Sequence, residues 1–190
     1  MSQKQRTRQI ASVRRSFLKA SGLGALFLAA PAIAKVTTPS AQIGRQISMN
    51  HLHTTEKIGL VYAEGPVYLD PALNKLNYFL RDHYTHEVGV MDPAIYDMLH
   101  DIRTALGARG HYEIISGYRS PGTNERLRTT RGGGVAKRSL HMDGKAIDVR
   151  LPGIPLAQLR DAAVSLQRGG VGFYPKDNFV HVDTGRFRTW

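Results

Sequence analysis

The sequence contains no cysteine. This absence excludes disulfide bonds, a lipid-modified cysteine anchor, and thiolates as nucleophiles or metal ligands. A metal ion would therefore need histidine, aspartate or glutamate side chains, and the chain has eight histidines to supply them. The hydrophobic fraction of 42% is ordinary for a globular core, so a largely disordered chain is not expected.

Acidic residues are scarce, because 15 Asp and Glu stand against 26 Lys and Arg, for a net charge of +11. The excess is concentrated at the start of the chain, where residues 1–34 hold six basic residues and no acidic one. The rest of the chain carries 20 basic and 15 acidic residues, a net charge of +5. Such a weak excess does not predict a nucleic-acid partner.

The sequence also lacks an apolar run long enough to span a bilayer. Its N-terminal run extends only from about Leu23 to Ala30, after the basic stretch RRSFLK and before an Ala-x-Ala site. These features predict a secretory signal peptide over residues 1–34, with no permanent membrane anchor. An uncleaved anchor helix is the alternative. RRSFLK resembles a twin-arginine signal, which implies export to the periplasm by that route.

The chain after the signal peptide is expected to form one domain. Residues 35–50 lack a convincing period and are predicted as a linker, with the linker proper at 35–42 and the domain at 43–190. The expected elements are a β-hairpin from 58–62 and 66–69, helices opening at Asp70-Pro71, Asp92-Pro93 and Pro155, and strands at 112–116, 145–150, 171–174 and 179–183. A polar, glycine-rich loop is expected at about 117–139. Early helices and separated strands favour an α+β fold.

Two of these strands carry polar residues on one face. In KAIDVR, Asp148 alternates with Ile147 and Val149, and in FVHVD, His181 alternates with two valines. If the strands pair, Asp148 and His181 can meet on one surface, and His141 in the turn before KAIDVR can reach the same point. Two imidazoles and a carboxylate suit a catalytic zinc ion with an open fourth position. A satisfied core histidine and a turn aspartate are the alternative.

Several motifs resemble one family. SLHMDGKAID (139–148) has the Ser-x-His-x-x-Gly-x-Ala-x-Asp pattern of the zinc D-Ala-D-Ala peptidases, a superfamily that includes Hedgehog signalling domains. SGYRSPGTN (116–124) is similar to the segment of this family that carries an arginine next to the substrate. NHLHTTE (50–56) and the end of the chain (169–190) resemble the YcbK-like branch, the murein endopeptidases called MepK. The resemblance implies an α+β fold with a small, mainly antiparallel sheet and helices packed on it.

The resemblance also implies site residues and a partner. One zinc ion would be held by His141, Asp148 and His181, with Arg119 as a catalytic cation. Ser139, Arg119 and Tyr118 would bind the substrate, the peptide stems of peptidoglycan. The implied function is an exported murein endopeptidase that cleaves peptide cross-links. A D,D- or L,D-carboxypeptidase that trims stem peptides, or a non-catalytic peptidoglycan-binding module, is the alternative.

The general base is the weak point of this interpretation. Many relatives have a glutamate three residues before the last ligand, whereas this chain has Asn178 there. Asp183 is the first candidate, since it shares a strand face with His181, and Asp177 is a poorer one. An equally plausible role for Asp183 is to orient a ligand imidazole. A base at Asp183 would make Asp183→Ala inactive but still able to bind zinc.

A basic, glycine-rich loop follows Arg119 in the sequence. Its cations are suited to the carboxylates of peptide stems, although a solvated loop without a partner is the alternative. They are Arg126, Arg128, Arg131, Lys137 and Arg138.

Overall fold

The computed structural model describes residues 44–130 and 135–190. The predicted signal peptide (1–34), the predicted linker (35–42) and Arg131 lie outside the described residues. The strands are β1 (Arg45–His51), β2 (Lys57–Glu64), β3 (Val67–Tyr68), β4 (Tyr112–Ser116), β5 (Ala146–Arg150), β6 (Gly170–Tyr174), β7 (Phe179–Asp183) and β8 (Arg188–Thr189). The helices are α1 (Asp70–Phe79), α2 (Ala94–Ala105), α3 (Pro121–Thr130) and α4 (Leu156–Ser165).

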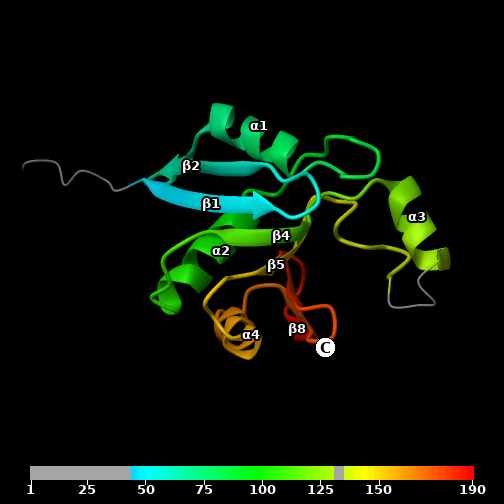
Figure 1. Cartoon of the computed structure of the whole chain (residues 1–190). Helices are drawn as coiled ribbons and strands as arrows, with labels where there is room; N and C mark the ends of the chain where they lie inside the picture. The colour runs from blue at the N-terminus through cyan, green and yellow to red at the C-terminus, as the bar shows by residue number, and fades with distance from the viewer. Residues whose placement is uncertain (1–43, 131–134) are drawn as a thin grey trace, which may run out of the picture. The chain divides into compact units, whose positions relative to one another are not determined.

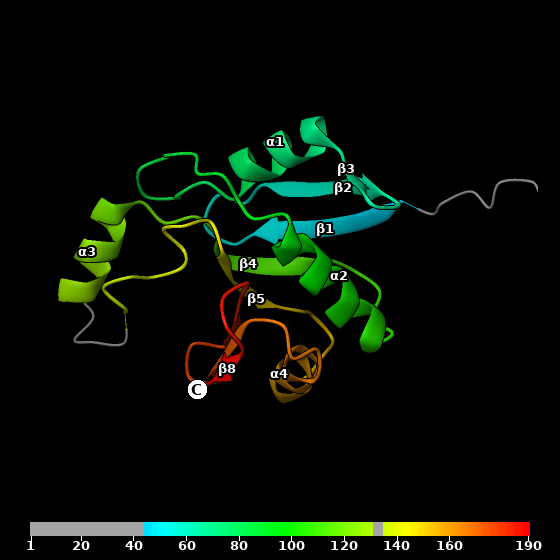
Figure 2. The ribbon, with the colours of Figure 1, turned by 180° about the vertical axis from the view of Figure 1, so that it is seen from behind.

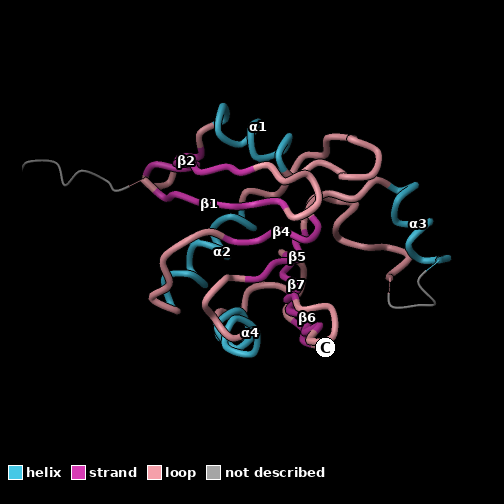
Figure 3. Tube along the Cα trace, in the orientation of Figure 1, coloured by secondary structure: helices cyan, strands magenta, loops and turns pink. Residues whose placement is uncertain are grey.

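The strands form one eight-stranded sheet in the order β3-β2-β1-β4-β5-β7-β6-β8. Figure 3 labels most of these strands in succession, from β2 through β1, β4, β5 and β7 to β6. The pairs β1–β4 and β6–β8 are parallel and the other pairs are antiparallel. With helices packed on this mainly antiparallel sheet, the structure confirms the expected α+β class. None of the helices in the described part of the chain is long and apolar enough to cross a membrane.

The predicted linker at 35–50 is wrong at its C-terminal end, because β1 occupies Arg45–His51 and lies between β2 and β4. Ile47, Met49 and His51 alternate toward the interior and are almost fully buried. Only two of these three are apolar, so the period-2 signal was weak in the sequence. Hydrogen bonding to both β2 and β4 stabilises this strand although its own apolar pattern is weak.

The predicted loop at 117–139 contains a helix, α3, which the sequence reading missed. α3 buries only Thr123 and Asn124, so it has no apolar stripe from which a helical period could be recognised. Its start has a local signal: the Ser120 side chain accepts a hydrogen bond from the Thr123 amide at 3.3 Å, and Pro121 follows it. In Figures 1 and 2, α3 lies to one side of the sheet, away from α4.

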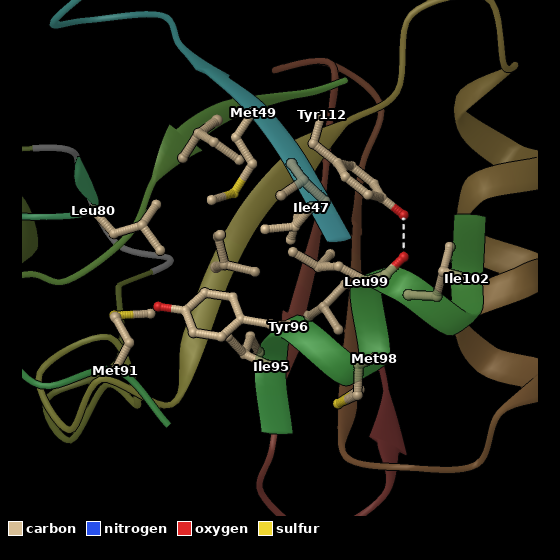
Figure 4. Packing of buried hydrophobic residues seen from close by; sticks show 14 of the residues in the cluster. Ile47, Met49, Leu80, Met91, Ile95, Tyr96, Met98, Leu99, Ile102 and Tyr112 are labelled. Atoms are coloured by element: carbon tan, nitrogen blue, oxygen red, sulfur yellow. Dashed lines mark hydrogen bonds between the residues drawn. The ribbon is translucent and has the colours of Figure 1, made fainter. Parts of the chain in front are cut away.

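The core lies between the sheet and the helices α1, α2 and α4. α1 packs on β2, α2 on β1, and α4 on β6 and β7. Figure 4 shows α2 contributing Ile95, Tyr96 and Leu99 to this core, where all three are fully buried. Tyr112 on β4 is also fully buried, and its hydroxyl donates to the Leu99 carbonyl at 2.8 Å. The bond satisfies a polar atom that burial would otherwise leave unpaired.

The register of β5 and β7 positions the polar residues. Asp148 lies directly opposite His181, and Ala146 lies opposite Asp183. A shift of one residue would turn His181 to the opposite face of the sheet. The turn before β5 is held by Gly144, whose carbonyl accepts from the Asp92 amide at 2.9 Å.

Gly144 is required in this turn for two reasons. Its φ is +65°, and a Cβ there would lie 1.9 Å from the Val90 carbonyl oxygen. We expect Gly144→Ala to lower the free energy of unfolding by about 3 kcal/mol, measured by urea denaturation. Gly107→Ala is the matched control, with φ +57° but nothing within 4 Å of the added Cβ, and should cost about 1 kcal/mol. Equal losses in both variants would contradict the steric argument.

Candidate metal centre and substrate cleft

Three side chains with metal-binding atoms converge at the middle of the sheet. His141 comes from the turn before β5, Asp148 from β5 and His181 from β7, and their donor atoms lie within 4.8 Å of one another. The Asp148 Oδ1 atom is 2.8 Å from His181 Nδ1 and 3.3 Å from His141 Nε2. All three residues are buried. The structure therefore brings together the three residues that the sequence predicted as zinc ligands.

The far nitrogen of each imidazole has a hydrogen-bond acceptor, so that nitrogen carries a proton. His141 Nδ1 lies 2.7 Å from the Gly117 carbonyl oxygen, which only accepts, so this nitrogen donates. His181 Nε2 lies 3.1 Å from Asp183 Oδ2 and donates to that carboxylate. The two nitrogens that face Asp148, His141 Nε2 and His181 Nδ1, are only 3.3 Å apart. Outer acceptors of this kind commonly orient metal-binding histidines.

The charges around these groups fit a cation. Burial lowers the pKa of His141, so its inward nitrogen presents a lone pair at neutral pH. Burial alone would raise the pKa of Asp148, but the two imidazoles beside it hold that pKa well below its usual range. Burial alone would lower the pKa of His181, yet Asp148 and Asp183 outweigh it and raise that pKa to about 9. A metal ion that binds at neutral pH would thus displace a proton from His181.

Asp183 lies behind His181, away from the other two donors. Its side chain is fully buried, and it accepts hydrogen bonds from the amides of Gly170 and Gly185 at 3.0 and 2.8 Å. Arg188 donates to both carboxylate oxygens at 3.0 and 2.7 Å. Burial alone would raise the pKa of Asp183, but His181, Arg188 and the amides keep it well below its usual range. This geometry favours the orienting role for Asp183 over the role of general base.

A cleft of about 640 Å³ opens in front of the three donors. Tyr118, Arg119 and Ser139 line it together with His141, Asp148 and His181, so the predicted substrate residues share one cavity with the metal-binding atoms. The guanidinium of Arg119 lies 3.8 Å from Asp148 Oδ2 and donates to Ser116 Oγ at 3.4 Å. Asp183 is not among the lining residues.

The basic loop contributes to the cleft only in part. Arg138 lines the cleft, and the Arg126 guanidinium lies 4.0 Å from the centre of the Tyr84 ring, which also lines it. Arg128 instead pairs with Glu125 on the exposed side of α3. Among the described residues of this loop, Arg126 and Arg138 therefore lie toward the cleft, whereas Arg128 lies on the outer surface.

Sequence reasoning missed several lining residues. His53 and His83, with rings stacked at 4.1 Å, line the cleft on one side, and Trp190 lines it on another. His83 and Trp190 approach the site through loop folding and the pairing of β8 with β6, which no local period reveals. For His53, the only available signal was its place in the family-like segment 50–56.

Comparison with known proteins agrees with these motifs. Residues 39–190 match the family described as peptidoglycan L,D-endopeptidase MepK. The chain is 44% identical over 179 residues to the peptidoglycan L,D-endopeptidase MepK of Escherichia coli K12, covering 93% of this chain and 96% of that protein. It is 40% identical over 180 residues to the probable peptidoglycan L,D-endopeptidase MepK of Haemophilus influenzae, covering 93% and 95%.

The two roles considered for Asp183 differ in their effect on metal binding. We expect Asp183→Asn to weaken metal affinity by about 10- to 100-fold, because the His181 imidazole loses its charged acceptor. Competition with a chromophoric chelator measures this affinity. Asp143→Asn, which changes an exposed carboxylate two residues from His141, should leave it unchanged. Unchanged metal affinity in Asp183→Asn, combined with lost hydrolysis, would restore Asp183 as the base.

Proposed function

The chain belongs to the peptidoglycan L,D-endopeptidase MepK family, and we propose that it is a zinc metallopeptidase that hydrolyses peptide cross-links of peptidoglycan. The observation that carries the proposal is the donor set formed by His141, Asp148 and His181. Both imidazoles have their outer nitrogens committed to acceptors, so their inner nitrogens face Asp148. Nitrogen and carboxylate donors without sulfur suit zinc in a catalytic site.

The zinc ion and the side chains around it have separate proposed roles in the reaction. Bound zinc would supply Lewis acidity, which polarises a carbonyl group and lowers the pKa of water. Arg119 is a fixed cation at the edge of the site, so it can stabilise negative charge that develops on the scissile carbonyl oxygen. Ser139 and Tyr118 line the same cleft and can position the substrate backbone. Asp183 acts through His181, by keeping its imidazole in one orientation.

Asp177 is the proposed general base. Among the described residues, three carboxylates line the cleft, those of Asp82, Asp148 and Asp177. Asp82 accepts hydrogen bonds from the amides of Tyr84 and Ser120, at 2.8 and 2.9 Å, one on each carboxylate oxygen. Asp148 belongs to the metal-binding set. Asp177 is exposed and makes no hydrogen bond or ion pair with the rest of the described chain. Its carboxylate oxygens therefore remain available to a substrate or water molecule in the cleft, as those of a general base must be.

The proposed location and partner follow from the reaction. Peptidoglycan lies outside the inner membrane, which requires export, and the twin-arginine-like signal is the proposed route. Arg119 and Arg138 give the cleft fixed positive charge, which suits the carboxylates of peptide stems.

Digestion of purified sacculi tests the proposed function. We expect the protein to convert cross-linked dimers to monomers, separated by chromatography, and to lose this activity with a chelator until zinc is restored. Release of terminal D-alanine alone would identify a carboxypeptidase. Sacculus binding without any cleavage by zinc-loaded protein would identify a binding module. Cleavage that resists complete metal removal would contradict the zinc mechanism.

Asp177→Asn tests the base. Asparagine suits a turn as well as aspartate does, so the fold and metal affinity should remain while kcat falls by about 10²- to 10⁴-fold. The kcat of a soluble cross-linked dimer and the metal content are measured together. Asp143→Asn serves again as the control and should retain full kcat. A kcat within about twofold of the unsubstituted protein would remove Asp177 from the mechanism.

A further inference from the structure

The two sides of the cleft differ in chemistry. The strands β5 and β7, which carry Asp148 and His181, are flanked by β4 on one side and by β6 and β8 on the other. Arg119 follows β4, whereas Trp190 follows β8, so a cation and an indole lie on opposite sides of the metal-binding atoms. Both residues line the cleft.

We propose that Trp190 is a substrate-binding platform that receives the apolar side-chain stem of the amino acid next to the scissile bond. The proposal rests on the peptidase function proposed above. The ring centre of Trp190 is 5.3 Å from that of His181. Consecutive Cα atoms of a peptide are about 3.8 Å apart, so a peptide bond held at the three donors has its neighbouring residue within reach of the indole.

The backbone and side chain of Trp190 are both fixed. Its amide donates to the Val171 carbonyl at 3.3 Å, and its carbonyl accepts from the Phe173 amide at 3.0 Å. The indole Nε1 donates to the Tyr174 hydroxyl at 2.8 Å. A Cβ on Gly172 would lie 2.7 Å from the indole Cε2 atom, so the ring packs directly against the backbone of β6.

The remaining contacts of Trp190 join it to the metal-binding residues. The Arg188 guanidinium lies 4.7 Å from the indole ring centre while it donates to both oxygens of Asp183. Asp183 in turn accepts from His181. Despite these contacts, half of the Trp190 surface is exposed, at 50%. A rigid ring that remains half exposed in a cleft can bind an apolar group with little loss of conformational entropy.

This arrangement gives the substrate a direction. The carboxylate-bearing part of a stem peptide would lie toward Arg119, and the apolar methylene part would lie on Trp190. Reversing the peptide would place methylene groups against the Arg119 guanidinium and carboxylates beside the indole, where the Arg188 guanidinium is already paired with Asp183. The two opposed sides of the cleft therefore determine the direction in which the cross-link binds.

Steady-state kinetics on a soluble cross-linked dimer test the platform. We expect Trp190→Ala to raise KM about 10-fold with unchanged metal content, and Trp190→Phe to stay within about threefold of the unsubstituted KM. Phe187→Ala is the matched control, because Phe187 is 47% exposed on the same segment but does not line the cleft, and its KM should not change.

Fluorescence gives a second reading that does not depend on activity. Trp190 is the sole tryptophan of the chain, so its emission reports on this position alone. We expect the dimer to shift the emission to shorter wavelength and to protect it from acrylamide quenching in protein freed of metal by a chelator. Calorimetry on the same samples establishes saturation with the dimer.

The outcomes separate the platform from the peptidase function. Unchanged KM in Trp190→Ala, or unchanged emission and quenching at saturation, would overturn the platform while cleavage of sacculi still supported the peptidase. A loss of metal from Trp190→Ala that accounts for its whole defect would also overturn it, because the indole would then only support Arg188. Absence of both cleavage and binding by the zinc-loaded, unsubstituted protein would overturn the proposed function itself.

Discussion

The pairing of β5 with β7 is the constraint on which the site depends. It places Asp148 opposite His181, and it does so between strands that are far apart in the chain. Every side chain alternates across the sheet, so a slip by one residue would separate the carboxylate from the imidazole. The valines of both strands pack into the core on the other face, and their burial therefore fixes the register that the polar face needs.

The second consequence of this register concerns Asp183. Because it lies two residues beyond His181, its side chain shares the polar face but reaches the outer nitrogen of the imidazole. Four further hydrogen bonds, from Arg188 and two backbone amides, hold the carboxylate there. The network compensates the cost of burying a charge, and it leaves Asp183 without a free oxygen directed at the cleft.

The sequence predicted the parts of this structure that local patterns encode. The alternation in FVHVD placed His181 on the polar face, and the Asp92-Pro93 pair preceded α2, where Asp92 accepts from the Ala94 amide at 3.0 Å. Asp70 instead lies inside the first turn of α1, after Leu69 as the capping residue. β1 and α3 were missed because neither carries a strong apolar period. Local sequence spacing did not predict that Asp183 lies behind His181 or that Trp190 lies near it. Both positions depend on tertiary packing.

The three donor atoms also join segments that are distant in the sequence. Asp148 and His181 are separated by 33 positions, and α4, β6 and their connections lie between them. An ion held by both residues closes this loop as a covalent cross-link would, and closing a loop removes entropy from the unfolded chain. In a chain without cysteine, this ion would act as a cross-link that a chelator can remove. Chelation would then loosen the C-terminal half of the sheet and make it easier for a protease to cut.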